Sequence, residues 1–150
     1  MYSGWPVPAR ISREVATGPM AKRKRQFFVA IVDDDAEVRA AIEDLLNSNG
    51  LRTRSFPSAE AFLQSVDGGE PGCLILDYRL PGMNGLELQR ELQAKGRDIP
   101  VIFATAEDEA FRLLQSPAVK AGALAVLRKP FDSEELPRLV KTAAASKRRR

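Results

Sequence analysis

The apolar residues of the chain gather in five short runs, which are separated by polar segments containing glycine and proline. The first run is apolar on both faces, as is typical of a strand buried in the middle of a parallel sheet. Between the runs, apolar residues recur every three or four positions, which predicts amphipathic helices. The predicted strands are 27–32, 51–56, 73–77, 99–104 and 124–127.

Helix-capping residues stand at the expected ends of the helical segments. Asp35 and Ser58 can cap the first two helices, and Gly50 follows the first one. Pro117 must kink or split the fourth helix, because proline lacks the backbone N–H that a helix interior needs. The predicted helices follow Asp35 and Ser58, span about 84–95 and about 107–121, and follow Asp132 or Ser133. The residues expected to face the core from the helices are Val38, Ala41, Ile42, Leu45, Ala61, Phe62, Val66, Leu88, Leu92, Leu136, Leu139 and Val140.

Five strands that alternate with five helices predict an α/β fold with three layers. In such a fold a five-stranded parallel sheet is covered by helices on both faces and joined by right-handed crossovers. At 150 residues the chain is long enough for one domain of this kind and too short for two of ordinary size.

The charged residues are unevenly distributed along the chain. Residues 1–26 carry six Lys or Arg and one acidic residue, and residues 141–150 carry five and none. Residues 27–140 therefore hold 12 basic and 19 acidic side chains, so the basic character belongs to the ends. We expect 1–26 to be a disordered basic extension, 27–145 the folded domain and 146–150 a basic tail. An acidic domain argues against direct, specific binding of nucleic acid.

Two residue types limit the possible chemistry. The chain contains no histidine, which excludes Ser-His and Cys-His dyads and imidazole metal ligands. Its single cysteine, Cys73, cannot form an intramolecular disulfide, so we interpret it as a small buried hydrophobe.

No apolar run is long enough to span a membrane, and the N-terminus lacks a secretory signal. We therefore expect a cytoplasmic protein.

Polar side chains follow the strands at their carboxyl ends, where parallel α/β sheets build their sites. The first strand is followed by Asp33 and Asp34, the third ends in Asp77, the fourth is followed by Thr105 and the fifth by Lys129. Three carboxylates in one crevice either raise a pKa or bind a cation, and ligation by oxygen alone favours Mg²⁺ or Mn²⁺. A lysine and a hydroxyl complete the groups that stabilise a transferring phosphoryl group, and Asp77 is the expected nucleophile.

Five motifs in this order resemble the receiver domain of bacterial two-component response regulators. They are Asp33-Asp34, Asp77, Leu80-Pro81-Gly82-Met83-Asn84-Gly85, Thr105-Ala106 and Lys129-Pro130-Phe131, and the likeness covers about residues 27–145. The resemblance implies a flavodoxin-like, CheY-like sheet with the strand order 2-1-3-4-5. It also implies a signalling domain rather than a true enzyme, with only weak phosphotransfer and autodephosphorylation of its own.

Two other families of similar architecture agree less well with the sequence. A flavodoxin-type cofactor binder would need a Gly- or Ser-rich phosphate loop after the first strand, and the sequence has none there. A phosphatase of the haloacid dehalogenase type would place its nucleophile after the first strand, which leaves Asp77 unexplained.

The resemblance implies roles for the acidic residues of the crevice. Asp77 would accept a phosphoryl group from the phosphohistidine of a sensor histidine kinase or a histidine phosphotransfer protein. Asp34, Asp77 and the backbone carbonyl of Arg79 would ligate Mg²⁺, and Asp33 would contact the ion through water.

The resemblance also implies roles for the residues that contact the phosphate. Lys129 would pair with the phosphorylated carboxylate, and the peptide between Lys129 and Pro130 would be cis. Thr105, which Ala106 follows, would swing to hydrogen-bond the phosphate and so report its arrival.

Val126 departs from the family pattern. The family often has an aromatic residue there that turns inward when the threonine moves, and valine has no comparable rotamer swing. We therefore expect output through backbone shifts in residues 106–128, read by a downstream protein or a second copy at helix 4, strand 5 and helix 5. Two alternatives stay open: a phosphorylation-independent interaction module, and the N-terminal part of a DNA-binding response regulator.

Overall fold

The computed structural model of the protein describes residues 27–65, 69–116, 119 and 122–148. Within these residues, five parallel strands form one sheet in the order β2-β1-β3-β4-β5, which confirms the predicted order. Each strand lies close to its predicted range. The strands are β1 (Phe28–Val32), β2 (Arg52–Phe56), β3 (Cys73–Asp77), β4 (Val101–Thr105) and β5 (Ala125–Arg128).

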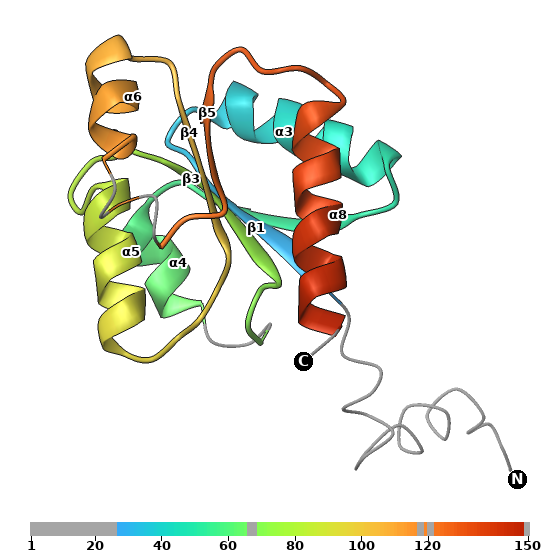
Figure 1. Ribbon diagram of the computed structural model, residues 1–150, viewed down its shortest axis with the longest axis horizontal. Coiled ribbons are helices and arrows are strands. Elements are labelled where there is room, and N and C mark those ends of the chain that lie inside the picture. Colours follow the sequence, from blue (N-terminus) through green and yellow to red (C-terminus); the bar gives the residue numbers. More distant parts are fainter. Residues whose placement is uncertain (1–26, 66–68, 117–118, 120–121, 149–150) are drawn as a thin grey trace, which may run out of the picture.

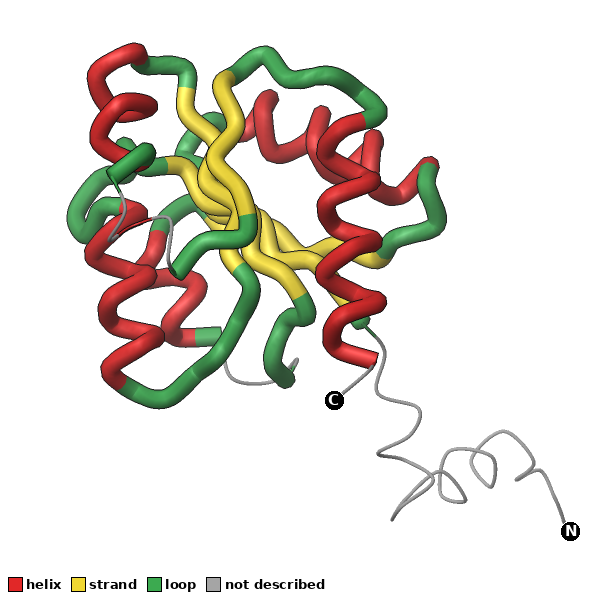
Figure 2. Tube along the Cα trace, viewed as in Figure 1, coloured by secondary structure: helices red, strands yellow, loops and turns green. Residues whose placement is uncertain are grey.

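Five helices cover the two faces of the sheet in the described part of the chain. On one face lie α3 (Ala36–Ser48) and α8 (Glu135–Arg148), and on the other lie α4 (Ala59–Gln64), α5 (Gly85–Ala94) and α6 (Asp108–Leu114) (Figure 1). The strands form the middle layer between the two groups of helices (Figure 2). The three-layer α/β architecture is therefore confirmed.

Alternate residues of the strands contribute to two separate hydrophobic clusters. On β1, Ala30 and Val32 belong to the cluster beneath α4, α5 and α6, whereas Val29 and Ile31 belong to the cluster beneath α3 and α8. All five residues of β1 are buried. A strand covered on both faces needs apolar residues at every position, which explains the unbroken apolar run in the sequence.

Cys73 begins β3 and packs inside the cluster beneath α3 and α8. It is a free cysteine and fully buried, which confirms its interpretation as a small hydrophobe. Burial raises the pKa of the Cys73 thiol to about 12, so the thiol stays protonated at neutral pH.

The predicted caps Asp35 and Ser58 stand at the starts of α3 and α4, and Asn84, for which the sequence predicts no capping role, stands at the start of α5. The Asp35 carboxylate accepts hydrogen bonds from two backbone N–H groups in the first turn of α3, and the Ser58 hydroxyl accepts one in α4. Asn84 caps α5 and forms a capping box with Glu87, which satisfies two backbone donors reciprocally. These caps fix where each helix leaves the carboxyl edge of the sheet.

The fourth predicted helix needs correction. It was expected over 107–121, but α6 ends at Leu114. Residues before a proline are disfavoured in the helical region, and Pro117 therefore limits how far the helix can continue. Residues 117–118 and 120–121 lie outside the described residues.

On α3, Ile42 lies in the core and Val38 and Leu45 pack against it, as predicted, but the prediction for Ala41 is wrong. Ala41 is exposed, whereas Ile42 and Leu46, four residues apart, are buried against the sheet. Val66, which was expected to face the core after α4, lies outside the described residues.

The last helix and the chain ends bear on the predicted domain limits. α8 continues to Arg148, past residue 145. The predicted extension 1–26 and residues 149–150 lie outside the described residues.

None of the helices in the described part of the chain has the length and apolar content needed to cross a membrane.

Candidate functional site

Three carboxylates meet at the carboxyl edge of the sheet. Asp33 and Asp34 follow β1, and Asp77 ends the neighbouring strand β3. One oxygen from each of the three lies within 4.8 Å of the others. The predicted convergence of these side chains is confirmed, because adjacent parallel strands deliver their last residues to the same edge.

Lys129 places a positive charge in this cluster. Its ammonium nitrogen lies 2.5 Å from Asp33 Oδ2 and 3.5 Å from Asp77 Oδ2. The side chains of Lys129, Asp33 and Asp77 are only 16%, 5% and 13% exposed, so these contacts are largely shielded from water. In this state Lys129 binds more closely to Asp33 than to Asp77.

Asp33 is fixed by further contacts with its own loop and with α3. Its Oδ1 accepts a hydrogen bond of 2.9 Å from the N–H of Asp35, and its carbonyl accepts one of 2.6 Å from the guanidinium of Arg39. Both carboxylate oxygens of Asp33 are therefore engaged. Asp34, by contrast, is exposed at the mouth of the crevice.

Asp77 ionises less readily than an ordinary aspartate. Burial raises the pKa of its carboxyl from 3.8 to about 6, the charge of Lys129 opposes this rise, and the charge of Asp33 adds to it. Three carboxylates and one ammonium leave excess negative charge in the crevice. A divalent cation bound through carboxylate oxygens is suited to this donor set.

The turn after Asp77 requires glycine at position 85. A Cβ atom on Gly85 would lie 2.3 Å from the carbonyl oxygen of Asp77, closer than real Cβ atoms approach. The N–H of Gly85 donates a hydrogen bond of 2.9 Å to the carbonyl of Tyr78. The start of α5 is therefore packed directly against the backbone of Asp77.

Thr105 ends β4, and Lys129 directly follows β5. Thr105 is buried, and its carbonyl accepts a hydrogen bond of 2.8 Å from the N–H of Lys129. Its hydroxyl oxygen accepts a hydrogen bond of 3.3 Å from the N–H of Glu107, and Ala106 between them is exposed. The peptide between Lys129 and Pro130 is cis, as the resemblance implies.

Two exposed residues at the crevice were not predicted as a pair. The guanidinium of Arg79 donates hydrogen bonds of 2.6, 2.8 and 2.9 Å to the two carboxylate oxygens of Glu107. The sequence predicts a role only for the backbone carbonyl of Arg79. A signal was nevertheless present, because each residue stands two positions after a residue of the site, Asp77 or Thr105.

Val126 lies in the middle of β5, in register with Phe103 on β4. It is half-buried and packs against the cluster beneath α4, α5 and α6. A small β-branched side chain therefore occupies the position at which the family often has an aromatic ring.

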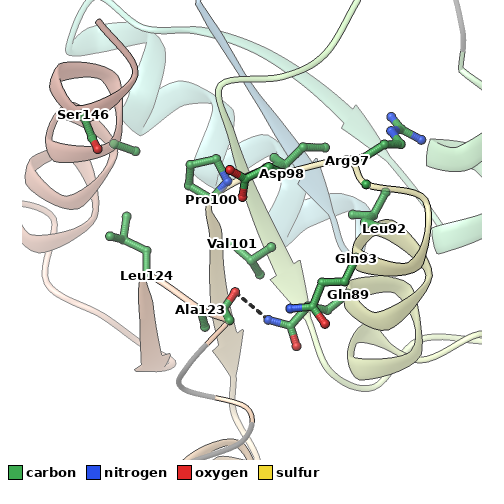
Figure 3. Close-up of a pocket in the computed structure, with 14 residues that line it drawn as sticks. Gln89, Leu92, Gln93, Arg97, Asp98, Pro100, Val101, Ala123, Leu124 and Ser146 are labelled. Atoms are coloured by element: carbon green, nitrogen blue, oxygen red, sulfur yellow. Dashed lines mark hydrogen bonds between the residues drawn. The ribbon is translucent and has the colours of Figure 1, made fainter. Parts of the chain in front are cut away.

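A separate cavity of about 480 Å³ lies at the opposite, amino-terminal edge of β4 and β5 (Figure 3). Within it, the side-chain amide of Gln89 on α5 donates a hydrogen bond of 2.8 Å to the carbonyl of Gly122. Gln89 is 4% exposed. This cavity shares no residue with the acidic crevice, so we interpret it as part of the packing between α5 and the segment before β5.

Comparison with known proteins agrees with this geometry. Residues 29–141 match the response regulator receiver domain family. The response regulator protein TmoT of Ectopseudomonas mendocina is 44% identical over 119 residues, which are 79% of this chain and 53% of TmoT. The chain spans about half the length of the curated relatives it matches.

Two solved structures share the fold. Response regulator StyR is 38% identical, with a TM-score of 0.69, over 81% of this chain and 62% of that one. Response regulator protein TrrA from Thermotoga maritima, solved in complex with Mg²⁺ and BeF, is 26% identical, with a TM-score of 0.68, over 79% of this chain and 99% of that one. The chain therefore belongs to the response regulator receiver domains, signalling proteins of two-component systems with a CheY-like fold.

Proposed function

We propose that the chain is a phosphorylation-controlled switch whose acceptor is Asp77. The observation that carries this proposal is the position of Asp77 at the end of β3, where two further carboxylates lie within 4.8 Å and the ammonium of Lys129 lies 3.5 Å away. The donor would be a phosphohistidine on a sensor histidine kinase or a histidine phosphotransfer protein.

The transfer exchanges one bond to phosphorus for another. A carboxylate oxygen of Asp77 attacks phosphorus, an O–P bond forms and the N–P bond of the phosphohistidine breaks. The electron pair of that bond returns to the imidazole of the donor, which leaves as a neutral ring once it is protonated. In the slow loss of the phosphoryl group, the oxygen of water attacks phosphorus and the O–P bond to Asp77 breaks, which regenerates the Asp77 carboxylate and releases inorganic phosphate.

Asp34, Asp77 and the backbone carbonyl of Arg79 would hold Mg²⁺, and Mn²⁺ is suited to the same oxygen ligands. Asp33 would contact the ion through water, because Lys129 and the N–H of Asp35 already occupy its two oxygens. When bound, the ion neutralises charge on the phosphoryl oxygens. TrrA, a member of the same fold, was solved with Mg²⁺ and BeF, which supports this assignment.

Lys129 and Thr105 would recognise the phosphorylated state. The ammonium of Lys129 would move from Asp33 toward the phosphoryl oxygens on Asp77, a short displacement because it already contacts both carboxylates. The hydroxyl of Thr105 would exchange the N–H of Glu107 for a phosphoryl oxygen, with the N–H of Ala106 as a second donor.

Phosphorylation would change how strongly this protein, in the cytoplasm, binds a partner, and this change would be its output signal. A downstream protein or a second copy would bind the surface formed by α6, β5 and α8, which are helix 4, strand 5 and helix 5 in the family order. The chain spans about half of its relatives, which favours a second candidate, the receiver part of a longer DNA-binding regulator. In either case the receiver itself would not read nucleic acid directly.

Incubation with Mg²⁺ and a small phosphodonor, followed by intact-mass spectrometry, tests the proposal. We expect one labile phosphate adduct on the parent protein and none on Asp77→Asn. Asp44→Asn, at an exposed position on α3, is the matched control and should be phosphorylated normally. A parent protein that never forms the adduct would support the phosphorylation-independent module instead.

A further inference from the structure

Arg79 and Glu107 join the two loops beside the acceptor. Their bidentate ion pair has three hydrogen bonds of 2.6 to 2.9 Å. Arg79 follows β3 and Glu107 follows β4, and these strands are neighbours with Asp77 in register with Ala104. The pair therefore bridges the carboxyl ends of two adjacent strands.

The backbone N–H groups of the same two residues contact the side chains that would change on phosphorylation. The N–H of Arg79 lies 3.4 Å from Asp77 Oδ1, and the N–H of Glu107 lies 3.3 Å from Thr105 Oγ1. A chain of contacts therefore runs from Asp77 through Arg79 and Glu107 to Thr105. It connects the residue that ends β3 to the residue that ends β4. A movement of the Asp77 or Thr105 side chain therefore alters a backbone contact of one member of the ion pair.

Glu107 also marks the start of α6. It occupies the N-cap position, yet its side chain makes no capping hydrogen bond, because its carboxylate is bound to Arg79. The next residue, Asp108, pairs with Arg128 at the end of β5. The position of Glu107 therefore affects how the first turn of α6 is held.

We propose that the Arg79–Glu107 ion pair is a partner-exchange switch, in which a phosphoryl group on Asp77 takes Arg79 and releases Glu107. This inference rests on the proposed phosphorylation of Asp77. The phosphoryl oxygens attract the guanidinium and repel the carboxylate, so both charges favour separation of the pair. The side chains are 63% and 46% exposed, and an ion pair this exposed is weak enough for a dianion to displace it.

The exchange connects the acceptor to α6 without an aromatic residue at position 126. Loss of Arg79 frees the carboxylate of Glu107 at the N-cap of α6, while Thr105 withdraws from the N–H of Glu107. Both events change the contacts of one residue at the start of α6. Arg79 and Glu107 are positioning residues in this scheme, since they act on the acceptor and on α6 without reacting.

Beryllofluoride with Mg²⁺ is the probe, because its tetrahedral beryllium and fluorides match a phosphoryl group bound to a carboxylate. The full chain is titrated by calorimetry in four forms: the parent, Arg79→Gln, Glu107→Gln and the double variant. The chain supplies a matched control in Arg97 and Glu70, a bidentate ion pair whose closest contact is also 2.6 Å. It joins the segments before β3 and β4, at the opposite edge of the sheet.

The two single variants are expected to act in opposite directions. Glu107→Gln frees Arg79 and lowers the half-saturating beryllofluoride concentration about 2- to 5-fold, whereas Arg79→Gln raises it by a similar factor. The double variant stays closer to Arg79→Gln than to the parent, because Glu107 acts mainly by holding Arg79 away from the phosphoryl group. Arg97→Gln and Glu70→Gln leave the value unchanged.

Three outcomes overturn the inference. Shifts in the same direction for both variants indicate loss of loop structure, a double variant that returns to the parental value indicates independent charge effects, and unchanged affinities show that the pair has no role. If the parent binds beryllofluoride in any of these cases, the proposed function stands and only the switch is rejected. If the parent binds none and forms no phosphate adduct, both are rejected.

Discussion

The behaviour of Asp77 is set by opposing effects on one carboxyl group. Burial and the neighbouring Asp33 raise its pKa, and Lys129 lowers it, with a result of about 6. Burial therefore has a larger effect than the nearby ammonium. At neutral pH the group is mostly ionised, as a nucleophile must be, but its charge is poorly solvated.

This pKa predicts that Asp77→Asn stabilises the metal-free protein at neutral pH. The folded pKa of about 6 lies above the ordinary 3.8, so the folded state binds the proton more tightly. The stabilisation of the folded state by protonation of Asp77 is present in full below about pH 4 and is lost as the pH rises through 6. We expect a gain in the free energy of unfolding on the order of 1–2 kcal/mol at pH 7.5 and little difference at pH 4.

Urea unfolding of parent and variant at the two pH values, with chelator present, measures this effect. Asp44→Asn is again the control, with equal effects at both pH values. A variant less stable than the parent at pH 7.5 would show that the Asp77 charge is well compensated by Lys129.

Gly85→Ala is expected to impair both stability and phosphorylation. The added methyl group would meet the carbonyl oxygen of Asp77 at 2.3 Å, so either α5 or the acceptor must move. Overpacking of this kind costs about 1–3 kcal/mol. Asn84→Ala, which removes the cap of the same helix, should cost about 1 kcal/mol and leave the phosphate adduct intact.

Urea unfolding and adduct formation, measured on both variants, separate the two effects. Equal adduct formation by Gly85→Ala and the parent would contradict the role assigned to the contact with Asp77.

Among the elements, α5 is held by specific polar contacts at its start and in its middle. Its first turn carries the capping box of Asn84 and Glu87, and its later turns place Gln89 against the carbonyl of Gly122. The first contact lies at the crevice and the second at the opposite edge. The helix therefore connects the turn after the acceptor to the segment that leads into β5.

Gln89→Leu is expected to destabilise the protein without changing its phosphorylation. It removes the donor to the Gly122 carbonyl, which costs about 1 kcal/mol. Gln93→Leu, at an exposed position of the same cavity, should change stability by less than about 0.5 kcal/mol. Thermal unfolding measures the stability of both variants. A loss of the phosphate adduct in Gln89→Leu would contradict the interpretation that this cavity is independent of the acidic crevice.

Capping and periodicity predicted most elements because their causes are local. Asp35 and Ser58 each cap a helix through residues within the next turn, so the neighbouring sequence is enough to place them. The end of α6 depends on how far a helix tolerates the approach to Pro117, which the sequence does not specify. The face of α3 that carries Leu46 rather than Ala41 depends on its packing angle against the sheet.

The residues of the site also divide into those whose position the sequence predicts and those whose contacts it does not predict. Asp33, Asp34, Asp77, Thr105 and Lys129 could be predicted, because parallel strands deliver their last residues to one edge. The spacing of Arg79 and Glu107 from Asp77 and Thr105 indicates that both lie near the crevice. It does not predict their pairing, since the pairing depends on the register of β3 against β4 and on the directions of two long side chains.

For the whole molecule, bound Mg²⁺ should increase stability by mass action. A ligand that binds only the folded state adds about 2.7 kcal/mol at a concentration about 100 times its Kd. We expect the melting temperature of the parent to rise with Mg²⁺ and to return on addition of chelator. Asp34→Asn should lose most of this response and Asp44→Asn should keep it, whereas equal responses would contradict the assigned ligands.

Removal of residues 1–26 should leave folding and phosphorylation unchanged. The described members of both hydrophobic clusters and the acidic residues of the crevice lie within 27–148. Circular dichroism and adduct formation on the shortened chain test this expectation. A protein that unfolds or fails to be phosphorylated would show that the extension contributes to the domain.

The burial of Cys73 has a practical consequence for spectroscopy. The only thiol in the chain is inaccessible and protonated at neutral pH, so maleimide reagents should not label the native protein. Leu113→Cys, at a position of α6 that is 46% exposed, would then carry a single fluorophore without removal of the native cysteine. Because Cys73 should not react, the fluorophore signal would come from position 113 alone and would report movement of α6 in real time.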